Sequence, residues 1–120
     1  MFRYLNVNPE NRKEPDCVIR AISLATDIPY YFVAKLLEHN GDIYSCDDLC
    51  VTCYSNLLSG VFRLTRRNGM KKTIGQISED FPNNTLLLRT DGHLSCSING
   101  IVYDIWDCTN EVCDVFWIVD

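Results

Sequence analysis

The sequence predicts an α+β fold in which N-terminal helices pack on a C-terminal antiparallel β-meander. Apolar residues recur at helical spacing through the first half of the chain, whereas short runs typical of strands dominate from residue 85 onward. Asn99-Gly100 lies between two of the expected strands and is a strong signal for a two-residue hairpin turn. At 120 residues, 47% of them hydrophobic, we expect a single domain over residues 1–120.

The first two helices are indicated by apolar spacing and by residues that start or stop a helix. Residues 16–26 carry Val18, Ile22 and Ala25 on one face, and Asp16 is the expected N-cap. A second helix should follow Pro29, with Gly41 as its stop signal.

Two more helices are expected before the strands begin. One starts near Asp47 and ends at Gly60, with Cys50, Cys53 and Tyr54 on its apolar stripe. The other is short and opens at Thr73-Ile-Gly-Gln76, which has the form of a capping box. Between them, residues 61–72 are compatible with a short strand followed by a turn.

Four strands are expected in the second half of the chain, at residues 85–90, 93–98, 101–106 and 115–119. If Asn99-Gly100 is the turn, Cys96 faces Tyr103 on the buried face of the hairpin. The opposite face then carries His93, Ser95 and Asp104, with Asp104 diagonal to His93. A diagonal pair is close enough for a carboxylate to reach an imidazole.

Charge and hydropathy exclude several classes of function. The chain has 11 basic and 16 acidic residues, and its net charge of −5 opposes nucleic-acid binding. No apolar run is long enough for a membrane span, and the N-terminus lacks the apolar core of a secretory signal. We therefore expect a cytoplasmic protein without a nucleic-acid or membrane partner.

The seven cysteines indicate a reducing compartment, because their number is odd and the apolar content supports an ordinary core. Most of the thiols are expected to be free, and only Cys17 has features of a nucleophile. It begins a predicted helix, where the helix dipole favours a thiolate, and His93 and Asp104 can supply a base and its orienting group. The alternative is that Cys17 is a small core residue.

These residues also carry a resemblance to a known family. Asp16-Cys17-Val18-Ile19-Arg20-Ala21-Ile22, followed by Gly92-His93 and Tyr103-Asp104-Ile105-Trp106-Asp107, is similar to small papain-like cysteine peptidases, notably those encoded by bacteriophages. The resemblance implies a papain-like domain, with a Cys17–His93–Asp104 triad that hydrolyses a peptide or protein substrate. It also implies that Asn11, six residues before the nucleophile, helps to form the oxyanion hole, and that the protein acts in a host cytoplasm.

Further roles follow from the predicted triad. Trp106 and Ser95 are expected to contact substrate, and the backbone N–H of Cys17 to stabilise the oxyanion. No cofactor is expected.

Two alternatives remain open. A catalytically silent protein with a papain-like scaffold could bind and inhibit a host enzyme or defence component. The C-x3-C-x2-C spacing of Cys46, Cys50 and Cys53 is also compatible with zinc if Cys108 or Cys113 is a fourth ligand, although an apolar helix stripe explains these thiols without metal.

Overall fold

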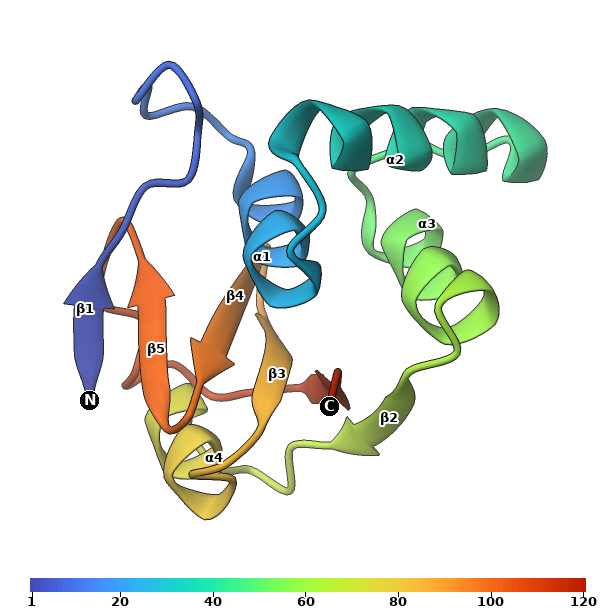
Figure 1. Cartoon of the computed structure of the whole chain (residues 1–120). Coiled ribbons are helices and arrows are strands. Elements are labelled where there is room, and N and C mark those ends of the chain that lie inside the picture. The colour runs from blue at the N-terminus through green and yellow to red at the C-terminus, as the bar shows by residue number, and fades with distance from the viewer.

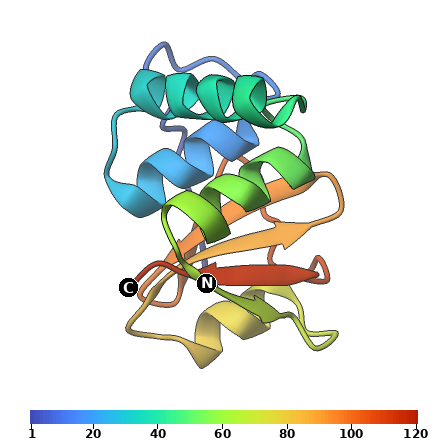
Figure 2. The ribbon, with the colours of Figure 1, turned by 90° about the vertical axis from the view of Figure 1, so that its right-hand side faces the viewer.

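The computed structural model describes residues 1–120 and has a six-stranded mixed sheet between two helical layers. The helices α1 (Cys17–Thr26), α2 (Tyr30–Tyr44) and α3 (Val51–Asn56) lie on one side of the sheet, and α4 (Ile74–Asp80) lies on the other (Figure 2). A π-helical segment, Leu57–Val61, continues α3. No single helix is long and apolar enough to cross a membrane.

The sheet has the strand order β1-β5-β4-β3-β6-β2 (Figure 1). Its strands are β1 (Phe2–Tyr4), β2 (Thr65–Asn68), β3 (Thr85–Thr90), β4 (His93–Ile98), β5 (Ile101–Asp104) and β6 (Val115–Ile118). The β3-β4-β5 part of the predicted meander is confirmed at the centre of this sheet, but β6 pairs with β3 and not with β5, so the four expected strands do not form one meander. Strand β1 pairs in parallel with β5, and β2 pairs with β6.

The hairpin register predicted from Asn99-Gly100 is confirmed. Both turn residues have positive φ, as a type I′ turn requires, and Cys96 lies opposite Tyr103. Pairing between β4 and β5 ends at that pair, so β5 stops at Asp104 and does not reach residue 106 as expected.

Both faces of the central strands β3 and β4 are largely buried, whereas β2 at one edge is exposed; this corrects the expectation of one apolar and one polar face. Leu87, Leu94, Cys96 and Trp117 join the core beneath α1, α2 and α3. Leu86, Leu88, Val102 and Phe116 form a second core with α4. Ser95 and Ser97 are buried on this second face, where Ser95 donates to Asp104 and the Ser97 hydroxyl has no partner.

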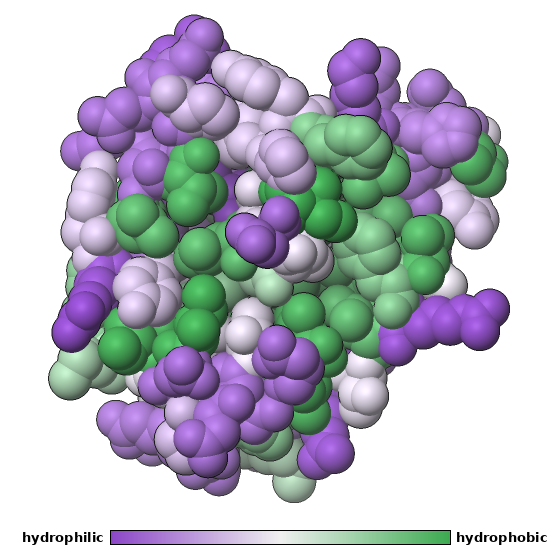
Figure 3. Space-filling model, in the orientation of Figure 1, coloured by the Kyte–Doolittle hydropathy of each residue, from purple (hydrophilic) through white to green (hydrophobic).

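Apolar side chains also extend from the first core to the surface. Figure 3 shows them across the middle of the face seen in Figure 1, with polar side chains towards the top left and the bottom. Leu24, Ala25, Ile28, Phe62 and Leu64 are partly buried residues that pack against this core.

The helix boundaries differ from the sequence predictions where side chains have other partners. Thr73 and Gln76 form the predicted capping box of α4. Asp16, however, makes no capping hydrogen bond at α1, because its carboxylate is bound to other side chains. Gly41 does not end α2; it lies inside the helix, where a Cβ would approach the Cys46 carbonyl oxygen to 2.9 Å.

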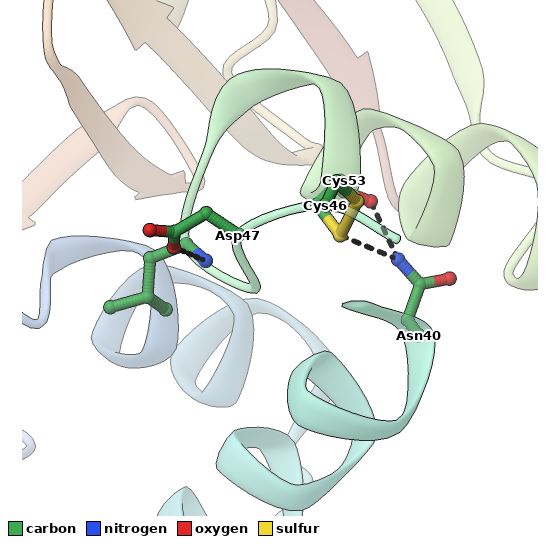
Figure 4. The surroundings of a disulfide bond; sticks show 5 residues. Asn40, Cys46, Asp47 and Cys53 are labelled. Atoms are coloured by element: carbon green, nitrogen blue, oxygen red, sulfur yellow. Dashed lines mark hydrogen bonds between the residues drawn. A yellow bond between two sulfur atoms is a disulfide. The ribbon is translucent and has the colours of Figure 1, made fainter. Parts of the chain in front are cut away.

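A disulfide joins Cys46 to Cys53, which the sequence analysis did not anticipate (Figure 4). The third helix begins at Val51 and not near Asp47, and the preceding turn brings the Cα atoms of the two cysteines to 5.9 Å. The Asn40 amide donates to the Cys53 carbonyl oxygen at 2.8 Å and so ties α2 to α3. The other five cysteines are free.

Replacing Cys46 by alanine is expected to lower the free energy of unfolding by about 2 kcal/mol, because a short covalent loop then no longer restricts the unfolded chain. Chemical denaturation without reductant measures this loss. As the control, the same comparison in reductant should show a much smaller difference. Seven free thiols in the denatured, unreduced wild type would contradict the disulfide.

Candidate active site

Cys17 is the first residue of α1 and is a half-buried, free thiol. At this position the backbone N–H has no acceptor within the helix, and the helix dipole favours negative charge. The first turn of α1 contains no acidic residue that would oppose a thiolate, although Asp16 precedes it. The sequence therefore folds so that one thiol lies at the positive end of a helix.

His93 begins β4, directly after the two-residue turn at Asp91-Gly92. Its Nε2 atom lies 2.6 Å from Oδ2 of Asp104, at the end of β5. The predicted contact between this imidazole and this carboxylate is therefore present. Since Nε2 is engaged, Nδ1 is the nitrogen left for a thiol partner.

Asp104 is 3% exposed and is held by several donors besides His93. The Ser95 hydroxyl donates to Oδ2 at 2.6 Å, and the backbone N–H of Ile105 donates to Oδ1 at 2.8 Å. Arg20 donates to Oδ1 at 3.1 Å, and Cys108 contacts Oδ2 through its sulfur at 3.7 Å. A carboxylate with this many donors is fixed in position and kept ionised.

Arg20 links this carboxylate to a second buried acid. Its Nε donates to Asp16 Oδ1 at 2.7 Å, and Tyr30 and Asn8 donate to Asp16 Oδ2 at 2.6 and 3.0 Å. The side chains of Arg20, Asp16 and Asp104 are each less than one-tenth exposed. Arg20 thus holds the start of α1 against the end of β5. Sequence reasoning missed it, although the Asp16–Arg20 spacing of four residues on one helix was a usable signal.

The contacts shift the pKa values of all three predicted triad members. Burial raises the pKa of the Cys17 thiol, but hydrogen bonds from His93 and the Leu94 backbone outweigh it, and the pKa is lowered. Burial lowers the pKa of His93, but hydrogen bonds with Asp104, Cys108 and Cys17 raise it to about 11. Burial raises the pKa of Asp104, but His93 and Ser95 lower it to about 2. The directions favour a thiolate beside an imidazolium, which is the reactive form of a cysteine nucleophile.

A cavity of about 550 Å³ opens at this group. Cys17 and His93 line it together with Leu49, Cys50, Tyr54 and Arg89. Its size lies within the range of small-ligand and substrate pockets. The Cys17 thiol therefore borders a cleft large enough for a small ligand.

The remaining predicted site residues lie in different places. Trp106 lines the cavity, is 42% exposed and has its ring centroid 5.0 Å from that of His93, where it can contact substrate. Ser95 is 1% exposed and donates to Asp104, so it orients the carboxylate and does not face the cavity. Asn11 is exposed in a loop with positive φ and is not part of the cavity wall.

Three of the same side chains have atoms that could bind a metal ion. His93, Asp104 and Cys108 offer one nitrogen, one oxygen and one sulfur atom within 4.8 Å of one another, a donor set that suits zinc. These atoms are already engaged with one another, and Arg20 places a positive charge on the same carboxylate. The C-x3-C-x2-C zinc alternative is wrong for this structure, because Cys46 and Cys53 are bonded to each other.

The raised pKa of His93 predicts a pH-dependent contribution to stability. A group whose pKa is higher in the folded than in the unfolded protein stabilises the folded state. For His93 this contribution is greatest below pH 6.5, its pKa in the unfolded chain, and it declines as the pH rises towards about 11. The lowered pKa of Cys17 has the opposite effect on the pH dependence of stability, so the comparison is made in the Cys17→Ala background, which lacks this thiol.

Chemical denaturation can compare Cys17→Ala with Cys17→Ala/His93→Gln. The stability difference between these two variants should shrink from about pH 6 to about pH 9. A constant or growing difference would show that Asp104 does not hold the imidazolium.

Comparison of the chain with protein-family models, with curated proteins and with solved structures finds no match.

Proposed function

We propose that this chain is a papain-like cysteine hydrolase that cleaves an amide bond in a peptide or protein substrate. One observation carries the proposal: a half-buried thiol at a helix start shares a cleft with an imidazole whose other nitrogen binds a buried carboxylate. This arrangement provides a nucleophile, a base beside it and a third group that orients the base, as thiol catalysis requires.

The reaction follows from the protonation states that these contacts favour. The Cys17 thiolate attacks the substrate carbonyl carbon, and the carbonyl π electrons move to oxygen. The protonated His93 gives its Nδ1 proton to the leaving amine, the C–N bond breaks and an acyl-thioester remains. His93 then accepts a proton from water, which attacks the thioester and releases the acid and Cys17.

The surrounding residues keep this arrangement in place. Asp104 holds the imidazole through Nε2 and stabilises its positive charge, while Ser95 and Arg20 hold Asp104. The backbone N–H of Cys17 is free to donate to the developing oxyanion. Trp106 forms part of the wall against which substrate binds.

A fluorogenic panel of short peptide amides and thioesters tests the proposal, with His93→Gln as the matched variant. We expect turnover by the wild type and a loss of about 10²-fold or more in the variant. Binding of a peptide without Cys17-dependent turnover of any substrate would instead favour a catalytically silent binding protein.

A further inference from the structure

The cavity lacks the side-chain oxyanion donor that the sequence resemblance implied. Asn11 is exposed and outside the cavity wall, so the Cys17 backbone N–H is left as one donor. An oxyanion in a thiol hydrolase is ordinarily stabilised by preorganised hydrogen-bond donors, and a side chain often supplies one of them. A second donor would have to come from another side chain of the cavity wall.

Tyr54 has the properties of such a donor. It is 4% exposed, belongs to α3 and lines the same cavity as Cys17 and His93. Its hydroxyl makes no hydrogen bond within the protein. The oxygen is nevertheless accessible, because Ser97 Oγ is the single fully buried side-chain oxygen or nitrogen without a partner. Buried phenol hydroxyls normally have a partner, so this one is open to a group that enters the cavity.

Tyr54 lies where the core meets the cavity, because it belongs to the buried core cluster and also lines the cavity. Arg89, Cys17 and Cys50 line the same cavity. The ring packs edge-on against buried Trp117, with centroids 6.2 Å apart. The ring is therefore anchored in the core, while the residue also forms part of the cavity wall.

We propose that the Tyr54 hydroxyl donates a hydrogen bond to the carbonyl oxygen of the substrate and is the second oxyanion donor beside the Cys17 backbone N–H. This inference rests on the proposed hydrolase function and assigns Tyr54 the role expected for Asn11. As the carbonyl oxygen gains charge, its hydrogen bond to the phenol strengthens, so the contact favours the transition state over the bound substrate.

Two further observations fit this role. Burial raises the pKa of Tyr54 to about 12, so the hydroxyl keeps its proton at neutral pH and remains a donor. The helix that carries Tyr54 is also fixed: the neighbouring residue Cys53 is bonded to Cys46, and Asn40 donates to the Cys53 carbonyl oxygen (Figure 4). A rigid donor needs little rearrangement when charge develops.

Tyr54→Phe tests the inference, because it removes one oxygen and keeps the ring that packs on Trp117. We expect kcat to fall about 10²-fold with KM within about twofold of wild type, as is typical for loss of one oxyanion donor. Asn11→Ala is the matched control and should leave both constants unchanged. Alkylation of Cys17 by iodoacetamide forms no oxyanion and should be as fast in Tyr54→Phe as in the wild type.

A second measurement does not depend on turnover. Peptide aldehydes add to the catalytic thiol as hemithioacetals, whose oxygen occupies the oxyanion position. Tyr54→Phe should weaken this binding about tenfold or more.

The outcomes separate this inference from the proposed function. Wild-type turnover with an unchanged kcat and unchanged aldehyde affinity in Tyr54→Phe overturns the role of Tyr54 alone. A rise in KM at unchanged kcat also overturns it, since it would show ground-state binding. A wild type that neither turns over substrate nor binds any aldehyde at Cys17 overturns both.

Discussion

Asp104→Ala is expected to lower the free energy of unfolding by about 3–5 kcal/mol, as found when one partner of a buried ion pair is removed. Arg20 would lose one of its two buried carboxylates, and the Ser95 hydroxyl its acceptor. The imidazole of His93 would lose the group that fixes its orientation. Urea denaturation followed by circular dichroism measures the loss.

Asp107→Ala is the control, because this carboxylate is only three residues away but exposed. Its carboxylate accepts hydrogen bonds only from the nearby Thr109, so the change should lower the free energy of unfolding by no more than about 1 kcal/mol. Similar losses in the two variants would mean that the buried network does not stabilise the fold.

Cys17→Ala should have the largest effect on catalysis, with kcat/KM reduced about 10³-fold or more, because Cys17 is the cavity thiol that His93 activates. The free energy of unfolding should change little, since the thiol is half-buried and small. Steady-state kinetics on a peptide amide that the wild type cleaves provides the measurement.

Cys50→Ala is the matched control for this loss. Cys50 is also a free, half-buried thiol on the wall of the same cavity, but it has no contact with the His93–Asp104 pair. Its replacement should change kcat/KM by no more than about threefold. A variant of Cys17 that retains full activity would exclude a covalent mechanism at this thiol.

The sequence was sufficient for the β4–β5 hairpin and its register, but not for the pairing of β6 with β3. Asn99-Gly100 fixes a two-residue turn whose geometry leaves one register, and that register brought Asp104 close to His93 and placed Asp107 elsewhere. The capping box that starts α4 likewise involves only residues close in sequence, Thr73 and Gln76. Local rules of this kind can be applied without knowing the tertiary structure.

The features that the sequence did not reveal depend on contacts between distant segments. Strand β1 is three residues long, too short to show a period, and is defined by its partner β5. The fixation of Asp104 by Arg20 joins residues 84 positions apart. The disulfide was missed because a helix was expected where a turn brings Cys46 to Cys53.

The residue proposed to stabilise the oxyanion was the hardest to predict for the same reason. A donor six residues before the nucleophile was expected at Asn11, but the preceding loop carries that side chain into solvent. Tyr54 belongs to an apolar helix stripe and has the pattern of a core residue. Its accessible hydroxyl becomes apparent only when the cavity wall is assembled.

The central claim is that His93, held by Asp104, makes Cys17 a thiolate. The most direct measurement is mass-spectrometric mapping of the cysteines modified by iodoacetamide near pH 6.5, because alkylation follows the thiolate fraction. The account predicts that Cys17 reacts first, and that His93→Gln slows Cys17 about tenfold or more while leaving the rate at Cys50 unchanged. A Cys17 that reacts no faster than Cys50, or that is unaffected by His93→Gln, would contradict it.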